Sequence, residues 1–80
     1  MGNAPVYKKK AGAIEVAVFE NEGAKKDGTA FNYKSAVLQR SYKDKQDEWK
    51  QEKINLREND IPKIQFVLKE AFGFMVERAD

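Results

Sequence analysis

The stretch AIEVAVFEN, residues 13–21, is the part of the chain that decides the fold. β-Branched residues occupy every second position and a mixed set lies between them: Ile14, Val16 and Val18 against Glu15, Ala17 and Phe19. Successive side chains of a strand point to opposite faces of a sheet, so this alternation favours a half-buried strand. The stretch therefore predicts a sheet with one apolar face that covers a core.

Two further segments with strand periodicity follow, at residues 31–42 and 48–57. Asp27-Gly28, before the first of them, is a hairpin signal. That first segment has two mixed faces, and its sequence leaves open which one meets the core: Tyr33, Ser35, Val37 and Gln39, or Lys34, Ala36, Leu38, Arg40 and Tyr42. In the last segment Ile54 and Leu56 are expected to face the core. The residues expected to face away from it are Trp49, Gln51, Lys53 and Asn55.

Residues 61–76 have helical periodicity, with Asp60 as the expected N-cap and Pro62 tolerated in the first turn. The apolar stripe comprises Ile61, Ile64, Leu68, Ala71, Phe72 and Met75, and further apolar residues lie beside it: Phe66, Val67, Phe74 and Val76. One stripe is enough to cover a sheet, so the extra width predicts that a second copy of the helix packs on this one. The expected dimer interface is Ile64, Leu68, Ala71, Phe72 and Met75. Gly73 either allows close approach of two backbones or simply weakens the last turn.

These patterns predict an α+β fold, a curved antiparallel meander of three or four strands followed by one C-terminal helix. Residues 1–12 are expected to form a flexible basic arm around Lys8–Lys10, although Val6 and Tyr7 could pair as a short edge strand. Residues 13–80 are expected to form a single domain. The chain has 80 residues without cysteine or histidine, so disulfides and histidine-bound metals cannot stabilise it. Oligomerisation is the remedy that remains for so small a core.

The composition argues against catalysis. Ser35 and Ser41 have no nearby base other than surface lysines, and the paired carboxylates fall in or beside hairpin loops. We therefore predict no enzyme activity, no cofactor, no metal site and no small-molecule substrate. No stretch approaches the roughly 20 apolar residues that span a bilayer, and the lack of cysteine fits an intracellular location, in the cytoplasm, nucleoid or nucleus.

Cations beside aromatic residues favour nucleic-acid binding, because bases stack on rings and phosphates meet positive charges. Lys34, Arg40 and Tyr42 fall at even spacings in one strand segment, and Trp49 and Lys53 do so in the next. The net charge is only +2, but residues 29–57 hold seven basic and four acidic side chains. The sequence thus predicts a homodimer that binds single-stranded DNA or RNA.

Other readings of the same residues stay open. Tyr42 and Trp49 could cover the edge of the core, and Phe19 could belong either to the core or to a stacking platform. The cations could simply keep exposed strands soluble and unaggregated. The whole chain could instead be a protein-interaction module that docks its apolar helix on a different protein.

In the order of its elements and in its local sequence, the chain resembles the single-stranded-DNA-binding transcriptional coactivators. This family is also called positive cofactor four, and its fold is shared with the Whirly proteins. The resemblance covers residues 13–76 and lies in residues 38–44, 48–50 and 53–56, followed by the helix from Ile61. It implies a dimer in which the helices pack together and two curved sheets form grooves for opposing single strands.

The resemblance also implies roles for particular residues. Arg40 matches an arginine that contacts the nucleic-acid backbone, and Tyr42-Lys43 falls at a Tyr-Trp pair of the family. Lys50 and Lys53 fall in its basic third strand. Phe19 and Asn21 fall at the end of its first strand, where the family has an arginine and a stacking phenylalanine. This chain departs from the pattern because Lys43 replaces the tryptophan, that arginine is missing and the first-strand ring is shifted. Trp49 offers a ring instead.

Overall fold

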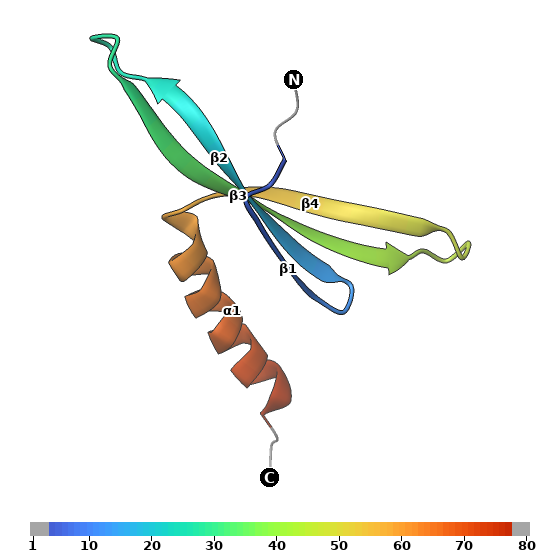
Figure 1. Ribbon diagram of the computed structural model, residues 1–80. Helices are drawn as coiled ribbons and strands as arrows, with labels where there is room; N and C mark the ends of the chain where they lie inside the picture. Colours follow the sequence, from blue (N-terminus) through green and yellow to red (C-terminus); the bar gives the residue numbers. More distant parts are fainter. Residues whose placement is uncertain (1–3, 78–80) are drawn as a thin grey trace.

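A computed structural model describes residues 4–77 as a four-stranded antiparallel sheet followed by one helix (Figure 1). The elements are β1 (Tyr7–Ala11), β2 (Ile14–Ala24), β3 (Ala30–Lys43), β4 (Trp49–Arg57) and α1 (Asp60–Val76). Neighbours in sequence are neighbours in the sheet, whose strand order is β1-β2-β3-β4. The α+β meander predicted from the sequence is confirmed, with four strands.

The N-terminal segment differs from the expected flexible arm and agrees with the alternative of an edge strand that includes Tyr7. Tyr7–Ala11 form β1, which pairs antiparallel with β2 so that Tyr7 lies opposite Val18 and Ala11 opposite Ile14. A two-residue turn joins the strands, with Gly12 at a φ of +60°. The three lysines of β1 remain exposed, as is usual for an edge strand, because pairing with β2 requires only backbone groups. Residues 1–3 of the expected arm and 78–80 of the expected domain lie outside the described residues.

The strand register gives the sheet two chemically different faces. The apolar face carries Ile14, Val16, Val18, Ala36, Leu38, Ile54 and Leu56. The opposite face, here called the aromatic face, carries Phe19, Phe31, Tyr33 and Trp49. The facing pairs settle the open register of β3: Leu38 belongs to the apolar face and Val37 to the aromatic face.

The two longer hairpins close with loops of the same design. Lys25 donates its N–H to Thr29 O at 2.9 Å, and Asp44 donates to Glu48 O at 2.9 Å. The fourth loop residue is left-handed in both, as Gly28 with φ +89° and as Asp47 with φ +63°. Glycine and aspartate are among the few residues that adopt this conformation readily. The second hairpin therefore turns sharply without a glycine.

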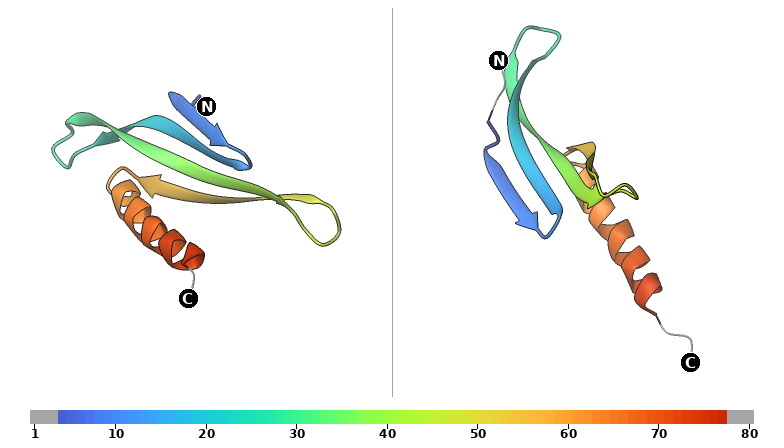
Figure 2. Two further views of the ribbon diagram at one scale, coloured as in Figure 1. Left: turned by 90° about the horizontal axis from the view of Figure 1, so that it is seen from below. Right: turned by 90° about the vertical axis from the view of Figure 1, so that its right-hand side faces the viewer.

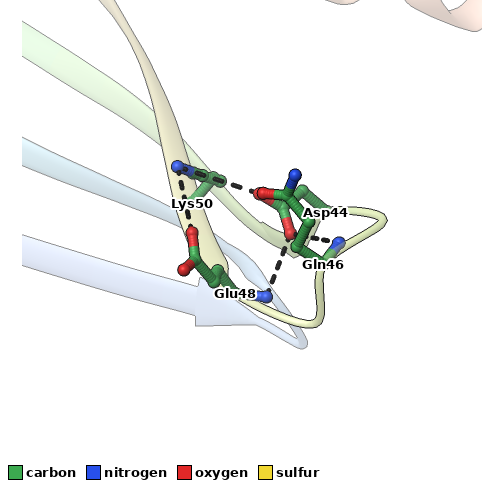
Figure 3. A network of polar contacts seen from close by, with 4 residues as sticks. All are labelled: Asp44, Gln46, Glu48 and Lys50. Carbon is green, nitrogen blue, oxygen red and sulfur yellow. Dashed lines mark hydrogen bonds and ion pairs between the residues drawn. The ribbon is translucent and has the colours of Figure 1, made fainter.

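Asp44 organises the β3–β4 loop. Its Oδ1 accepts the backbone N–H of Gln46 at 2.9 Å and that of Glu48 at 3.0 Å (Figure 3). Such side-chain hydrogen bonds to nearby backbone groups are the usual turn chemistry of aspartate. They hold the end of β3 and the start of β4 in register.

The helix is attached to the sheet only at its beginning. Ala36 and Leu56 face each other across β3 and β4 and are the buried hydrophobic residues of the described chain, with 2% and 7% of their surface exposed. Ile61 and Ile64 in the first turns of α1 are half-buried, which places this end of the helix over the apolar face. No residue of α1 is buried, and the rest of the helix extends away from the sheet (Figure 2).

The N-cap residue of α1 differs from the one expected from the sequence. The N-cap position is Asn59, which makes no side-chain capping hydrogen bond. Asp60 lies inside the first turn, and its Oδ2 accepts the backbone N–H of Arg57 at 3.0 Å. The prediction of Asp60 as N-cap is therefore wrong, because its carboxylate turns back toward the end of β4.

A single chain is far from compact. Its radius of gyration is 17.1 Å, whereas about 12 Å is typical of a folded domain of this length. Its accessible surface is 7447 Å², against about 4,900 Å² for a compact monomer of this mass. Residues 4–77 on their own thus form no enclosed core.

Candidate nucleic-acid interface

The aromatic face gathers rings and positive charges along the whole sheet. Its strands carry four rings, those of Phe19, Phe31, Tyr33 and Trp49. They also carry five cations and one acid: Lys8, Lys10, Lys43, Lys53 and Arg57, with Glu15. Rings, cations and few acids on one extended surface are what a single strand of nucleic acid requires.

The register divides the eight residues that the sequence predicted to bind nucleic acid. Four lie together on the aromatic face: Phe19, Lys43, Trp49 and Lys53. The other four point to the apolar side of the sheet: Lys34, Arg40, Tyr42 and Lys50. One flat strand of nucleic acid cannot contact both sets, because the sheet separates them.

The three predicted cations on the apolar side, Lys34, Arg40 and Lys50, are engaged with carboxylates. Arg40 Nε donates to Glu52 Oε1 at 2.9 Å, and its guanidinium also lies 4.7 Å from the centre of the Tyr42 ring. Lys50 Nζ lies 3.8 Å from Asp44 Oδ2 and 3.7 Å from Glu48 Oε1 (Figure 3). Lys34 Nζ lies 3.7 Å from Glu20 Oε2. Exposed pairs like these add little stability, but they compensate the positive charge locally.

The aromatic face retains more of its positive charge. Lys8 Nζ lies 3.9 Å from Glu15 Oε2, and Lys43 Nζ lies 3.3 Å from Oδ1 of Asp47 in the neighbouring loop. Within residues 4–77, Lys10, Lys53 and Arg57 have no carboxylate oxygen within ion-pair distance. Three cations on this face are therefore available to an anionic ligand.

Trp49 is the most accessible ring of the aromatic face, with 67% of its surface exposed. Lys43 lies opposite it across β3 and β4, and the ammonium nitrogen sits 5.5 Å from the centre of a Trp49 ring. Because the cation lies over one face of the ring, a base can stack on the other face. This pair marks the β3–β4 end of the face.

Phe19 borders a shallow groove of about 340 Å³ at the middle of the same face. The groove is also lined by Ala17, Val37, Gln39, Lys53, Asn55 and Glu15. Phe19 is half-buried, so one part of its ring packs on the sheet while another borders the groove. Its position next to an unpaired lysine fits a ligand contact.

Five rings and cations of this face were not among the predicted binding residues: Lys8, Lys10, Phe31, Tyr33 and Arg57. Phe31 and Tyr33 form a ring pair with centroids 5.8 Å apart, and Arg57 ends β4 opposite Ser35. The two-residue spacing of Phe31 and Tyr33 at the start of β3 was the sequence signal that placed their rings on one face. It pointed to this surface only once the facing partners in β2 and β4 were known.

Comparisons of the chain with protein-family models, curated proteins and solved structures found no match. The resemblance to the coactivator family therefore stays a prediction.

In the part of the chain that the structure describes, no three potential metal-ligating side chains come together. Over the same residues, α1 is neither long nor apolar enough to cross a membrane.

Proposed function

We propose that the chain forms a homodimer that binds single-stranded nucleic acid, with DNA as the first candidate, through the aromatic face of each sheet. The observation that carries this proposal is the concentration of four rings and five cations, against one acid, on one face of the sheet. Rings accept any base and cations accept any phosphate. Binding is therefore expected to depend little on sequence.

The proposed path of the strand follows β3, which has residues on the aromatic face along its entire length. β3 contains 14 residues, which at about 3.3 Å per residue span roughly 45 Å. Trp49 and Lys43 lie at one end of this path, Phe19 and Lys53 near its middle, and Phe31 and Tyr33 at the other end. Such a path accommodates several nucleotides.

The exposed surface supports dimerisation. The excess over a compact monomer of this mass is about 2,500 Å² per chain, and obligate dimers commonly bury about 2,000–5,000 Å² in total. A second copy of the same chain brings a matching excess, so each copy can bury the surface that the other exposes. The proposed interface on α1 is the one predicted from the sequence, which is part of the apolar stripe: Ile64, Leu68, Ala71, Phe72 and Met75.

A protein-interaction module is the second candidate, and the same helix favours it. No residue of α1 is buried, so its apolar surface could equally dock on a different protein. This alternative makes the sheet a scaffold and predicts no affinity for nucleic acid. A monomer in solution that captures another protein stoichiometrically would favour it.

The nucleic-acid proposal is tested by comparing Trp49→Ala with Tyr42→Ala. Trp49 belongs to the aromatic face, whereas Tyr42 lies on the other side of the sheet beneath Arg40. Loss of one stacking ring is worth about 1–3 kcal/mol per base. Fluorescence anisotropy with a labelled single strand should show weaker binding for Trp49→Ala and nearly unchanged binding for Tyr42→Ala. The reverse order would move the interface to the opposite side of the sheet.

A further inference from the structure

The hairpin of β2 and β3 extends beyond the end of β4 and leaves a groove there. Facing pairs of β3 with β4 end at Ser35 and Arg57, whereas pairs of β2 with β3 continue to Ala24 and Ala30. An open groove of about 890 Å³ lies between this projecting hairpin and the turn that leads into α1. It is larger than the groove beside Phe19, and its lining combines rings, amides and one guanidinium.

Two rings form the apolar wall of the groove. Phe31 and Tyr33 have 40% and 48% of their surface exposed. Phe31 faces Gly23 on β2, and a Cβ at Gly23 would lie 2.8 Å from Phe31 Cζ. The glycine therefore lets the ring lie directly over the β2 backbone. A ring supported in this way is held in place for stacking on its free side.

Polar groups line the remainder of the groove. Asn21 Nδ2 donates to Ser35 Oγ at 2.9 Å, which orients the amide and leaves its carbonyl oxygen to accept from a ligand. Asn55 and Arg57 also border the groove. On this side β3 has no strand neighbour from Ala30 to Lys34, so its outer backbone groups are unpaired by the sheet. Hydrogen-bond donors and acceptors thus stand beside the two rings.

We propose that this groove holds one base of the bound strand, stacked on Phe31 and Tyr33 and hydrogen-bonded by Asn21 or Asn55. The inference rests on the proposed function and adds a specific base-binding position to it. Glu58 and Asp60 also border the groove and disfavour a phosphate inside it. The adjoining phosphate therefore remains at the rim, where Arg57 has no carboxylate partner among the described residues.

Substitutions on the two sides of the projecting hairpin test the proposal. Phe31→Ala and Tyr33→Ala should each weaken binding of a single-stranded oligonucleotide by about 5- to 150-fold. Gly23→Ala should weaken it less, because its methyl group displaces the Phe31 ring without removing it. Asn32→Ala is the matched control, since Asn32 lies between the two rings in sequence but on the other face of the hairpin. It should bind like the wild type.

A second measurement locates the base directly. An oligonucleotide containing 5-iodouracil, cross-linked to the wild-type protein by light and digested, should yield adducts within residues 31–33. Two results would overturn the proposal of a base-binding groove and leave the proposed function standing. One is that adducts are confined to Phe19 and Trp49. The other is that Phe31→Ala and Tyr33→Ala leave the affinity unchanged while Trp49→Ala lowers it. No binding of any single strand by the wild-type protein would overturn both.

Discussion

Replacing Phe72 by alanine should break the proposed dimer. In the single chain 66% of the Phe72 surface is exposed, although it belongs to the apolar stripe of α1. An aromatic side chain exposes roughly 200 Å² when free, so about 130 Å² per chain is available for a partner to cover. The substitution removes most of this area without touching the sheet.

The size of the effect follows from that area. At about 25 cal/mol per Å², the ring contributes about 3 kcal/mol per chain, of which alanine retains roughly a third. The loss is then about 2 kcal/mol per chain and about 4 kcal/mol per symmetric dimer, or a Kd about a thousandfold higher. A dimer that is stable at nanomolar concentration would dissociate at micromolar concentration.

Phe66 provides a matched control on the same helix. It has nearly the same exposure, 65%, but lies six positions earlier, which at about 100° per residue places it about 120° around the helix from Phe72. Phe66→Ala removes an equal ring outside the stripe. Sedimentation velocity over a range of concentrations should show a weakened dimer for Phe72→Ala and a wild-type dimer for Phe66→Ala.

Two results would contradict the proposed dimer interface on α1. A wild-type chain that sediments as a monomer at micromolar concentration would show that the exposed stripe serves another purpose. Equal effects of the two substitutions would show that the stripe does not define the interface. Both results are independent of nucleic-acid binding, so the dimer and the interface on the aromatic face are tested separately.

Three further outcomes are expected. Lys53→Gln should reduce the slope of log affinity against log salt by about 0.7, whereas Arg40→Gln, whose side chain pairs with Glu52 on the other face, should leave the slope unchanged in the same titrations. Gly28→Ala should lower the free energy of unfolding in urea by about 1–2 kcal/mol, because φ there is +89°; an unchanged value would contradict the left-handed loop. The Thr29 N–H bound to Asp27 lowers the pKa of this carboxyl below its ordinary value of 3.8. Its contribution to stability is therefore present above that value and is lost as the pH falls through the lowered pKa, so the stability gap between wild type and Asp27→Ala should narrow in acid; a gap that widens would contradict the assignment.

The faces of individual strands were predictable because the two-residue period of a strand is fixed by its geometry. Ile14, Val16 and Val18 share a face as expected, and so do Ile54 and Leu56. The hairpin at Asp27-Gly28 was also predictable, because glycine is the preferred residue at a left-handed position. In these places local chemistry alone decides the structure.

The relation between strands was not predictable from their periodicity. The loop at residues 44–48 determines which side chains of β3 and β4 share a face. In this loop Asp47 has the left-handed conformation that glycine has in the hairpin of β2 and β3. That loop sets Lys43 opposite Trp49, so Arg40 and Tyr42 come to lie with Ile54 rather than with Trp49. The candidate site was therefore divided between two faces.

The strand β1 was difficult to predict because of its amino-acid composition. Lys8–Lys10 provide no apolar alternation, and an edge strand needs none, since backbone pairing with β2 holds it. Its lysines also belong to both sides of the sheet, with Lys8 and Lys10 on the aromatic face and Lys9 on the other. Two cations of the candidate interface thus came from a segment that the sequence assigned to a flexible arm.

Binding of single-stranded nucleic acid is tested most directly by titrating labelled single-stranded DNA of about 20 nucleotides with the wild-type protein. Fluorescence anisotropy is recorded at several salt concentrations, beside a duplex of the same sequence. We expect tight binding that prefers the single strand, with log affinity falling by about 0.7 per contacted phosphate as log salt rises. Absence of binding at low salt, or equal binding of single strand and duplex, would contradict it.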